Sequence, residues 1–161
     1  MSQRFLISLP LHDRSGWALN DRDSRWLEGR HRQSATRLSL RMWNASLPVT
    51  PTECEKQVRR WRPELLRPEP SQLVDSQEVR VPRDFTGRVQ AFVLRDPEGR
   101  VHGHLQYFGA KARQCLSVLY STRDASRNAD VVIAARLDAL MRQSLAGLAE
   151  RSVEQRFGSR P

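Results

Sequence analysis

The chain has 161 residues, of which 39% are hydrophobic and 28% are charged. This length allows one domain with a buried core, and the composition excludes a disordered tail. No apolar run approaches the ~20 residues of a membrane-spanning helix, so the sequence predicts no transmembrane segment. The formal net charge of +9 fits a polyanionic partner, but all basic residues except Lys56 and Lys111 are arginines spread along the chain, as codon usage in a GC-rich genome also produces.

The N-terminal part contains one predicted strand, residues 4–9 (RFLISL), followed by a polar segment rich in turn residues. Its short apolar run is not followed by a small-residue cleavage site, which is not typical of a signal peptide. Residues 26–27 fit a short helix or a turn. In residues 36–44 (TRLSLRMWN) apolar and polar side chains alternate, which predicts a half-buried strand.

A short helix is predicted for residues 51–61. Thr50 followed by Glu53 forms a capping-box pattern, and Pro51 falls at the first helical position, where its missing N–H has no consequence. Pro63 disfavours helical geometry in the residue before it, so the helix should end there.

The next block predicts an antiparallel meander. Its connections are too short for parallel crossovers, and the sequence DPEGR between the second and third strands is typical of a hairpin turn. The strand candidates are SQEVRVP (76–82), RVQAFVLRD (88–96), RVHGHLQYF (100–108) and QCLSVLYST (114–122).

A long amphipathic helix is predicted for residues 130–153, because apolar residues recur there at three- and four-residue spacing. The sequence as a whole therefore predicts one α+β domain over residues 1–158, with a frayed tail at 159–161. We expect a mainly antiparallel sheet of about five to six strands, flanked by the 51–61 helix and the long C-terminal helix.

The two cysteines are predicted to be structural. Cys54, Val58 and Trp61 share the apolar face of the first helix, and Cys54 is placed to meet Val49, the residue before the cap. A helix N-terminus favours a reactive thiolate, but burial opposes ionisation and no base lies nearby in the sequence. With Cys115, Cys54 forms either a disulfide or a pair of buried thiols, and the sequence leaves both open.

A disulfide would fix the arrangement of the helices. Leu116, Val118 and Tyr120 form the more apolar face of their strand, which the long helix should cover. A bridge to Cys115 would hold the first helix on the opposite face, with the sheet between two helices. A disulfide would place the protein in the cell envelope or periplasm, and its absence would favour the cytoplasm.

His102 and His104 are two residues apart on a predicted strand, so both rings project from one face. That spacing suits two metal ligands, but no further Cys, Asp or Glu accompanies it with ligand spacing. We interpret the pair as solvated histidines on the open half of a sheet, and the sequence predicts no metal and no cofactor.

The best local basic cluster surrounds one tryptophan. Arg59, Arg60 and Arg62 flank Trp61, and arginines interleaved with aromatic residues can bind a polyanion or stack on bases. The simpler interpretation, which we favour, is that the tryptophans fill the core while the arginines cover its rim.

The motifs resemble a known group of proteins. The run RLSLRMWNAS…TPTECEKQVRRWRPEL, followed by VHGHLQYFGAKARQCLSVLYST and a closing amphipathic helix, resembles a family of uncharacterised envelope-type proteins from GC-rich bacteria, over about residues 36–150. This resemblance implies an envelope location and a shared cysteine pair. The order of elements is also similar to that of the PsbP/Mog1-like group, whose members bind other proteins and are mostly not enzymes.

These observations favour a non-enzymatic protein-binding or assembly module of the bacterial envelope. Glycine-rich phosphate loops, nucleophile elbows, HExxH helices and CxxC pairs are all missing from the sequence, which lowers the expectation of an enzyme. The alternative is a nucleic-acid or polyanion-binding accessory protein. The third hypothesis is a hydrolase or metal enzyme that uses the strand histidines.

Overall fold

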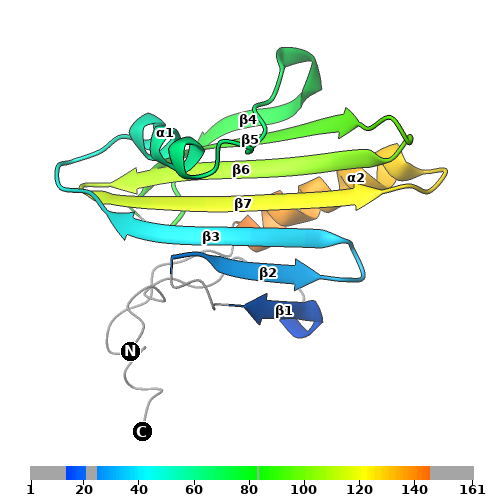
Figure 1. The fold of residues 1–161 in the computed structure, drawn as a ribbon, viewed down its shortest axis with the longest axis horizontal. Coiled ribbons are helices and arrows are strands. Elements are labelled where there is room, and N and C mark those ends of the chain that lie inside the picture. Colours follow the sequence, from blue (N-terminus) through cyan, green and yellow to red (C-terminus); the bar gives the residue numbers. More distant parts are fainter. Residues whose placement is uncertain (1–13, 21–24, 83, 146–161) are drawn as a thin grey trace, which may run out of the picture.

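The computed structural model describes residues 14–20, 25–82 and 84–145. Within them, one seven-stranded antiparallel sheet carries a helix on each face (Figure 1). The spatial order is β1-β2-β3-β7-β6-β5-β4. The strands are β1 Trp17–Asn20, β2 Leu27–His31, β3 Thr36–Asn44, β4 Leu73–Val79, β5 Thr86–Arg95, β6 Val101–Lys111 and β7 Gln114–Asp124. The helices are α1 Pro51–Trp61 and α2 Ala129–Ala139, which continues as a π-helical segment, Leu140–Leu145.

The α+β class and the antiparallel meander are confirmed, but the expected strand count is too low. The interpretation of residues 26–27 as a helix or turn is wrong, because Leu27 begins β2 and Trp17–Asn20 forms β1. Both strands are short and lack a clear apolar alternation, so the pairing of β2 with β3 and of β1 with β2 decides their conformation. The predicted strand at 4–9 lies outside the described residues.

Helix α1 has the predicted bounds and the predicted cap. Thr50 Oγ1 accepts a hydrogen bond from Glu53 N at 3.2 Å, and Thr50 N donates to Glu53 Oε1 at 2.9 Å. At the other end Arg62 N donates to Val58 O, and the chain then leaves the helix before Pro63. The local sequence is therefore sufficient to set both ends of this helix.

Helix α2 covers the centre of one face of the sheet, behind β6 and β7 in Figure 1. Ile133 and Leu137 are buried against this face, and the helix approaches so closely that a Cβ added at Gly103 would lie 2.7 Å from Ile133 Cγ2. The glycine in the predicted strand VHGH is thus explained by helix packing. The predicted helix extended to 153, and residues beyond 145 lie outside the described part of the chain.

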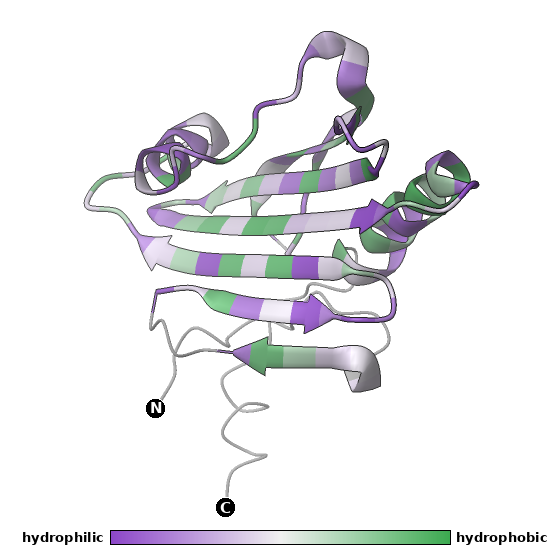
Figure 2. Ribbon diagram, turned by 45° about the vertical axis from the view of Figure 1, so that its right-hand side comes forward, coloured by the Kyte–Doolittle hydropathy of each residue, from purple (hydrophilic) through white to green (hydrophobic). Residues whose placement is uncertain are grey.

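Helix α1 covers only part of the opposite face. Val58 packs with Phe108 and Leu119, while Cys54 packs with Ala110 and reaches the sheet. Figure 2 shows the alternation of hydrophobic and hydrophilic residues along β3 and its neighbours that separates the two faces. The part of this face that α1 leaves uncovered carries the polar side chains of the strands.

A disulfide joins Cys54 of α1 to Cys115 of β7, with an Sγ–Sγ distance of 2.05 Å and a Cα–Cα distance of 5.6 Å. Both cysteines are fully buried. Of the two alternatives that the sequence left open, the structure has the bridge. The sheet lies between two helices, with Leu116, Val118 and Tyr120 on the α2 side and Cys115 on the α1 side.

None of the helices in the described residues combines the length and the apolar character that crossing a membrane would require.

Candidate functional site

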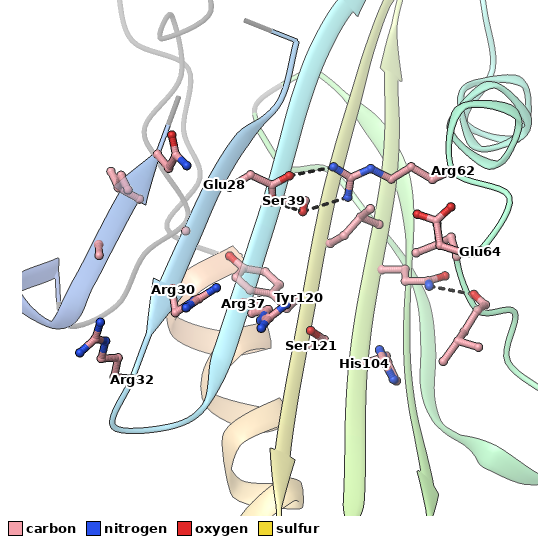
Figure 3. Close-up of a pocket in the computed structure, with 18 residues that line it drawn as sticks. Glu28, Arg30, Arg32, Arg37, Ser39, Arg62, Glu64, His104, Tyr120 and Ser121 are labelled. Atoms are coloured by element: carbon pink, nitrogen blue, oxygen red, sulfur yellow. Dashed lines mark hydrogen bonds and ion pairs between the residues drawn. The ribbon is translucent and has the colours of Figure 1, made fainter. Parts of the chain in front are cut away.

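An open groove of about 880 Å³ lies on the α1 face of the sheet, beside the helix. Strands β2, β3, β7 and β6 form its floor, and β1 and the chain segment that follows α1 form its sides (Figure 3). A smaller pocket of about 370 Å³ adjoins it at the β2–β3 turn. Both cavities share Arg30, Arg32, Arg37, His104 and Ser121.

Strand register places the central residues of this groove in one row. Arg30 on β2 pairs with Arg37 on β3, Arg37 pairs with Ser121 on β7, and Ser121 pairs with His104 on β6. Residues paired across neighbouring strands point to the same face, so these four side chains all project into the groove. Figure 3 shows Arg30 and Arg37 reaching over the same part of the sheet.

Four exposed arginines make this end of the groove strongly basic. Arg32 lies in the β2–β3 turn, and Arg123 lies two residues beyond Ser121 on β7, on the same face. In residues 14–20, 25–82 and 84–145, no acidic side chain forms an ion pair with Arg30, Arg32, Arg37 or Arg123. Their charge is therefore available to an external anion.

The opposite end of the groove is closed by an internal ion pair. Arg62 Nη2 lies 2.8 Å from Glu28 Oε1, and Arg62 Nη1 donates to Ser39 Oγ at 3.0 Å (Figure 3). Ser39 Oγ in turn donates to Glu28 Oε2 at 2.5 Å. The guanidinium of Arg62 also stacks over Trp26, 3.8 Å from the ring centroid. Arg62 thus stabilises the fold, and Glu28 already compensates its charge.

Arg59 fixes the segment that follows α1. Its side chain is buried, with Nε 2.9 Å from Glu55 Oε2 and Nη2 donating to Gln106 Oε1 at 3.0 Å. Nη1 donates to the carbonyls of Leu65 and Leu66 at 3.3 and 3.2 Å. This network holds the chain after α1 against the sheet, where it forms one side of the groove.

Three of the tryptophans lie around the half-buried side chain of Arg41. The guanidinium of Arg41 lies 3.6 Å from the ring centroid of Trp61 and within 6 Å of the centroids of Trp26 and Trp43. Trp43 and Trp61 meet edge to face, with centroids 4.9 Å apart. The interleaving of Trp and Arg in the sequence therefore produces internal cation–π contacts that hold the end of α1 on the sheet.

The four residues proposed from the sequence as a polyanion-binding cluster do not form one open surface. Arg59 is only 8% exposed, Arg62 is paired with Glu28, and Trp61 is covered by Arg41. Arg60 alone is exposed. The basic surface of the groove lies on other strands.

The two strand histidines have different environments. His104 stacks on Phe92, with centroids 5.0 Å apart, and burial together with the nearby charge of His102 lowers the pKa of His104 to about 4. His102 Nε2 lies 2.8 Å from Asp96 Oδ2. This hydrogen bond lowers the pKa of Asp96 far below its usual value, and Arg100 adds to the effect against a smaller opposing effect of burial.

Neither histidine is the solvated side chain that we expected, because one is stacked on an aromatic ring and the other is held by a carboxylate. No group of three or more His, Cys, Asp or Glu residues in the described part of the chain is arranged to hold a metal ion. At neutral pH His104 is uncharged and contributes a hydrogen-bonding ring to the groove, not a positive charge.

Sequence reasoning missed Arg30, Arg32, Arg37 and Arg123 as site residues. The alternation in residues 36–44 places Arg37 on the polar face of its strand, but it gives no signal for the other three arginines. The pairing that brings the other arginines beside it joins distant parts of the chain, so only the folded sheet shows the cluster.

No family model and no curated protein matches the chain. A crystal structure of a protein from Bacteroides thetaiotaomicron VPI-5482 is similar, with a TM-score of 0.49 and 6% sequence identity. The match covers 86% of this chain and 43% of the other, so the chain spans less than half of that protein's length.

Proposed function

We propose that the protein is a non-enzymatic binding module that holds an acidic segment of a partner protein in its basic groove. The observation that supports this proposal most directly is the pairing of Arg30 with Arg37 across β2 and β3. Like charges directly opposite each other destabilise a sheet, and a bound anion would remove that repulsion. The described acidic residues supply no such counter-charge.

The contents of the groove support binding in preference to catalysis. Ser121 and His104 are neighbours in the row, but no hydrogen bond joins them in the described part of the structure, and no carboxylate orients the His104 ring. An activated serine needs both contacts. The groove therefore offers positive charge and hydrogen-bond donors without an activated nucleophile.

A protein segment fits the groove better than a nucleic acid does. Single-stranded nucleic acids bind largely by stacking their bases on aromatic rings. None of the described tryptophans lines the groove or the adjoining pocket, so bases bound there would have no tryptophan ring on which to stack. The pocket at the β2–β3 turn is lined by four arginines and by no described acidic residue, and this group of cations matches carboxylates.

The disulfide supports a location in an oxidising compartment. Disulfides persist in the periplasm and outside the cell and are rare in the cytosol. The Cys54–Cys115 bridge is buried and joins the helix beside the groove to the sheet beneath it. We therefore place the proposed binding module in the cell envelope.

Chemical crosslinking in the native cell, followed by affinity purification, tests this function. The double variant Arg30→Ala/Arg37→Ala removes the two paired cations. The matched control, Arg60→Ala/Arg113→Ala, removes the same total charge from exposed positions outside the groove. We expect one defined partner to crosslink to the wild type and to the control, and at least tenfold less of it to crosslink to the groove variant.

Equal recovery of the partner with both double variants would show that the groove does not bind it. Binding to heparin tests the polyanion alternative. That alternative is favoured if retention falls steeply with salt and falls equally for both double variants. Recovery of a partner only with the groove intact is the result that the proposal requires.

A further inference from the structure

The smaller pocket at the β2–β3 turn contains more positive charge than one carboxylate can balance. Arg30, Arg32, Arg37 and Arg123 all line it, and all four are exposed and free of ion pairs with the described acidic residues. An Asp or Glu side chain carries a single negative charge. Bound alone in this pocket, it would leave most of the mutual repulsion of the arginines in place.

The strand register places three of these arginines at neighbouring positions on one face of the sheet. Arg30 and Arg37 are directly paired on neighbouring strands. Arg123 is the diagonal neighbour of Arg37, since Arg37 pairs with Ser121 and Arg123 lies two residues further along β7. Diagonal neighbours on a sheet are about 7–8 Å apart, which long side chains can span. All three side chains can therefore contact one small group above Ser121.

The uncharged groups of the pocket are also suited to an oxyanion. The Ser121 hydroxyl lies between Arg37 and His104 in the row and forms no hydrogen bond within the described residues. His104 is neutral at pH 7, so its ring can donate one N–H without requiring a further negative charge. Three forked guanidinium groups with a hydroxyl provide donors for three or four oxygen atoms, whereas a carboxylate has two.

We propose that Arg30, Arg37 and Arg123, with the hydroxyl of Ser121, form a subsite for a phosphate monoester. Such a group carries nearly two negative charges and three acceptor oxygens, which match the charge and the donors of the pocket. This inference rests on the proposed function, because the phosphate is the group that the partner protein presents at this end of the groove.

A titration of the oxidised, ¹⁵N-labelled protein with inorganic phosphate, sulfate and acetate at constant ionic strength tests the subsite. Phosphate and sulfate should shift the same amide resonances of β2, β3 and β7, with an affinity at least tenfold higher than that of acetate. The variant Arg123→Gln should weaken phosphate binding by about tenfold or more, because it removes a positive charge and a charge-assisted hydrogen bond to the anion. Arg60→Gln, which removes an exposed charge outside both cavities, should leave the affinity within twofold.

Equal affinities for phosphate and acetate, or equal effects of Arg123→Gln and Arg60→Gln, would overturn the subsite. These results would leave the proposed function intact if crosslinking to the partner still depended on Arg30 and Arg37.

The source of the phosphate is tested with vesicles of phosphatidylcholine that contain phosphatidic acid. We expect that the protein does not float with these vesicles, because the proposed phosphate belongs to a partner protein and not to a lipid. Flotation that is lost in the Arg30→Ala/Arg37→Ala variant would place the phosphate on a lipid, which supports the subsite and contradicts the proposed protein partner.

Discussion

At the scale of single residues, the groove contains charges that the fold does not need. Arg59 and Arg62 are bound to acids, carbonyls or aromatic rings and hold α1 and the following segment in place. Arg30 and Arg37, by contrast, face each other with no compensating acid among the described residues. A residue pair that lowers the stability of the fold and makes no stabilising contact is typical of a binding site.

The first prediction concerns this pair. Arg37→Thr replaces one of two opposed cations with a residue that favours strands, so we expect the free energy of unfolding to rise by about 0.2–1 kcal/mol. Urea unfolding at low salt measures the change, and the gain should shrink as salt screens the repulsion. A loss of stability, or a gain that is independent of salt, would contradict the opposed-charge interpretation.

The second prediction concerns pH. Burial keeps His104 neutral in the folded protein, with a pKa of about 4, whereas the unfolded chain has a histidine pKa near 6.5. Between these values the unfolded state binds more protons, so the contribution of His104 to stability is complete above pH ~6.5 and is lost as the pH falls toward 4.

His104→Gln should therefore lose less stability than the wild type between pH 6.5 and 4, measured by thermal unfolding across that range. Below about pH 4 both proteins should lose stability in parallel, because the pKa values of Asp96 and Asp124 are lowered in the folded state and protonation of these carboxylates then favours unfolding. Identical curves for the two proteins above pH 4 would show that His104 is not held neutral by the fold.

At the scale of secondary-structure elements, α1 is held to the sheet by three independent contacts. The Cys54–Cys115 bridge fixes its first turns, Arg59 joins its last turn to Gln106, and Trp61 packs on Trp43. The helix has only 11 residues, a length at which an isolated helix is marginal in water. Its position, and with it one side of the groove, depends on these contacts.

The third prediction concerns the disulfide. It closes a loop with a sequence separation of 61, so its reduction should lower the free energy of unfolding by about 4 kcal/mol in the chain-entropy description. Denaturant unfolding with and without reductant measures the difference. The Cys54→Ala/Cys115→Ala variant is the control, because its stability should not respond to reductant. A wild type that is equally stable under both conditions would refute this role.

The fourth prediction concerns the buried guanidinium of α1. Arg59→Ala leaves Gln106 Oε1 and the carbonyls of Leu65 and Leu66 without a donor, so we expect a loss of about 2–4 kcal/mol. Arg60→Ala removes the neighbouring, exposed arginine and should change stability by less than about 0.5 kcal/mol. Similar losses for both variants in denaturant unfolding would show that the Arg59 network does not stabilise the fold.

At the scale of the whole molecule, the two faces of the sheet have different roles. The α2 face forms the main core, which includes Leu105, Tyr107 and Tyr120. The α1 face is closed by a helix at one end and remains open and basic at the other (Figure 1). Four of the described basic side chains gather at this open end, where they are suited to an anionic ligand.

The fifth prediction follows from the bridge and concerns the protein in its native cell. If the protein resides in the envelope, protein extracted under acid quench should be oxidised, and iodoacetamide should modify neither cysteine unless reductant is added. Intact-mass measurement distinguishes the two states. Alkylation of both cysteines before reduction would place the protein in a reducing compartment and contradict the proposed location.

The sequence by itself determined the features that depend on neighbouring residues. The capping box around Thr50, the hairpin turn at DPEGR and the apolar repeats that begin α2 each act over a few positions, so their pattern predicted an α+β domain and the bounds of α1. The shared face of Cys54 and Val58 likewise follows from helix geometry alone, and it indicated that this cysteine is buried.

Only the tertiary structure decided the rest. Strands β1 and β2 have weak local preferences, and the pairing of β2 with β3 and of β1 with β2 gives them their conformation. The same pairing places Arg30 beside Arg37, and packing turns Arg59 inward while Arg60 stays exposed. The physical reason is that sheet hydrogen bonds and buried ion pairs join residues far apart in the chain, whose partners no local pattern specifies.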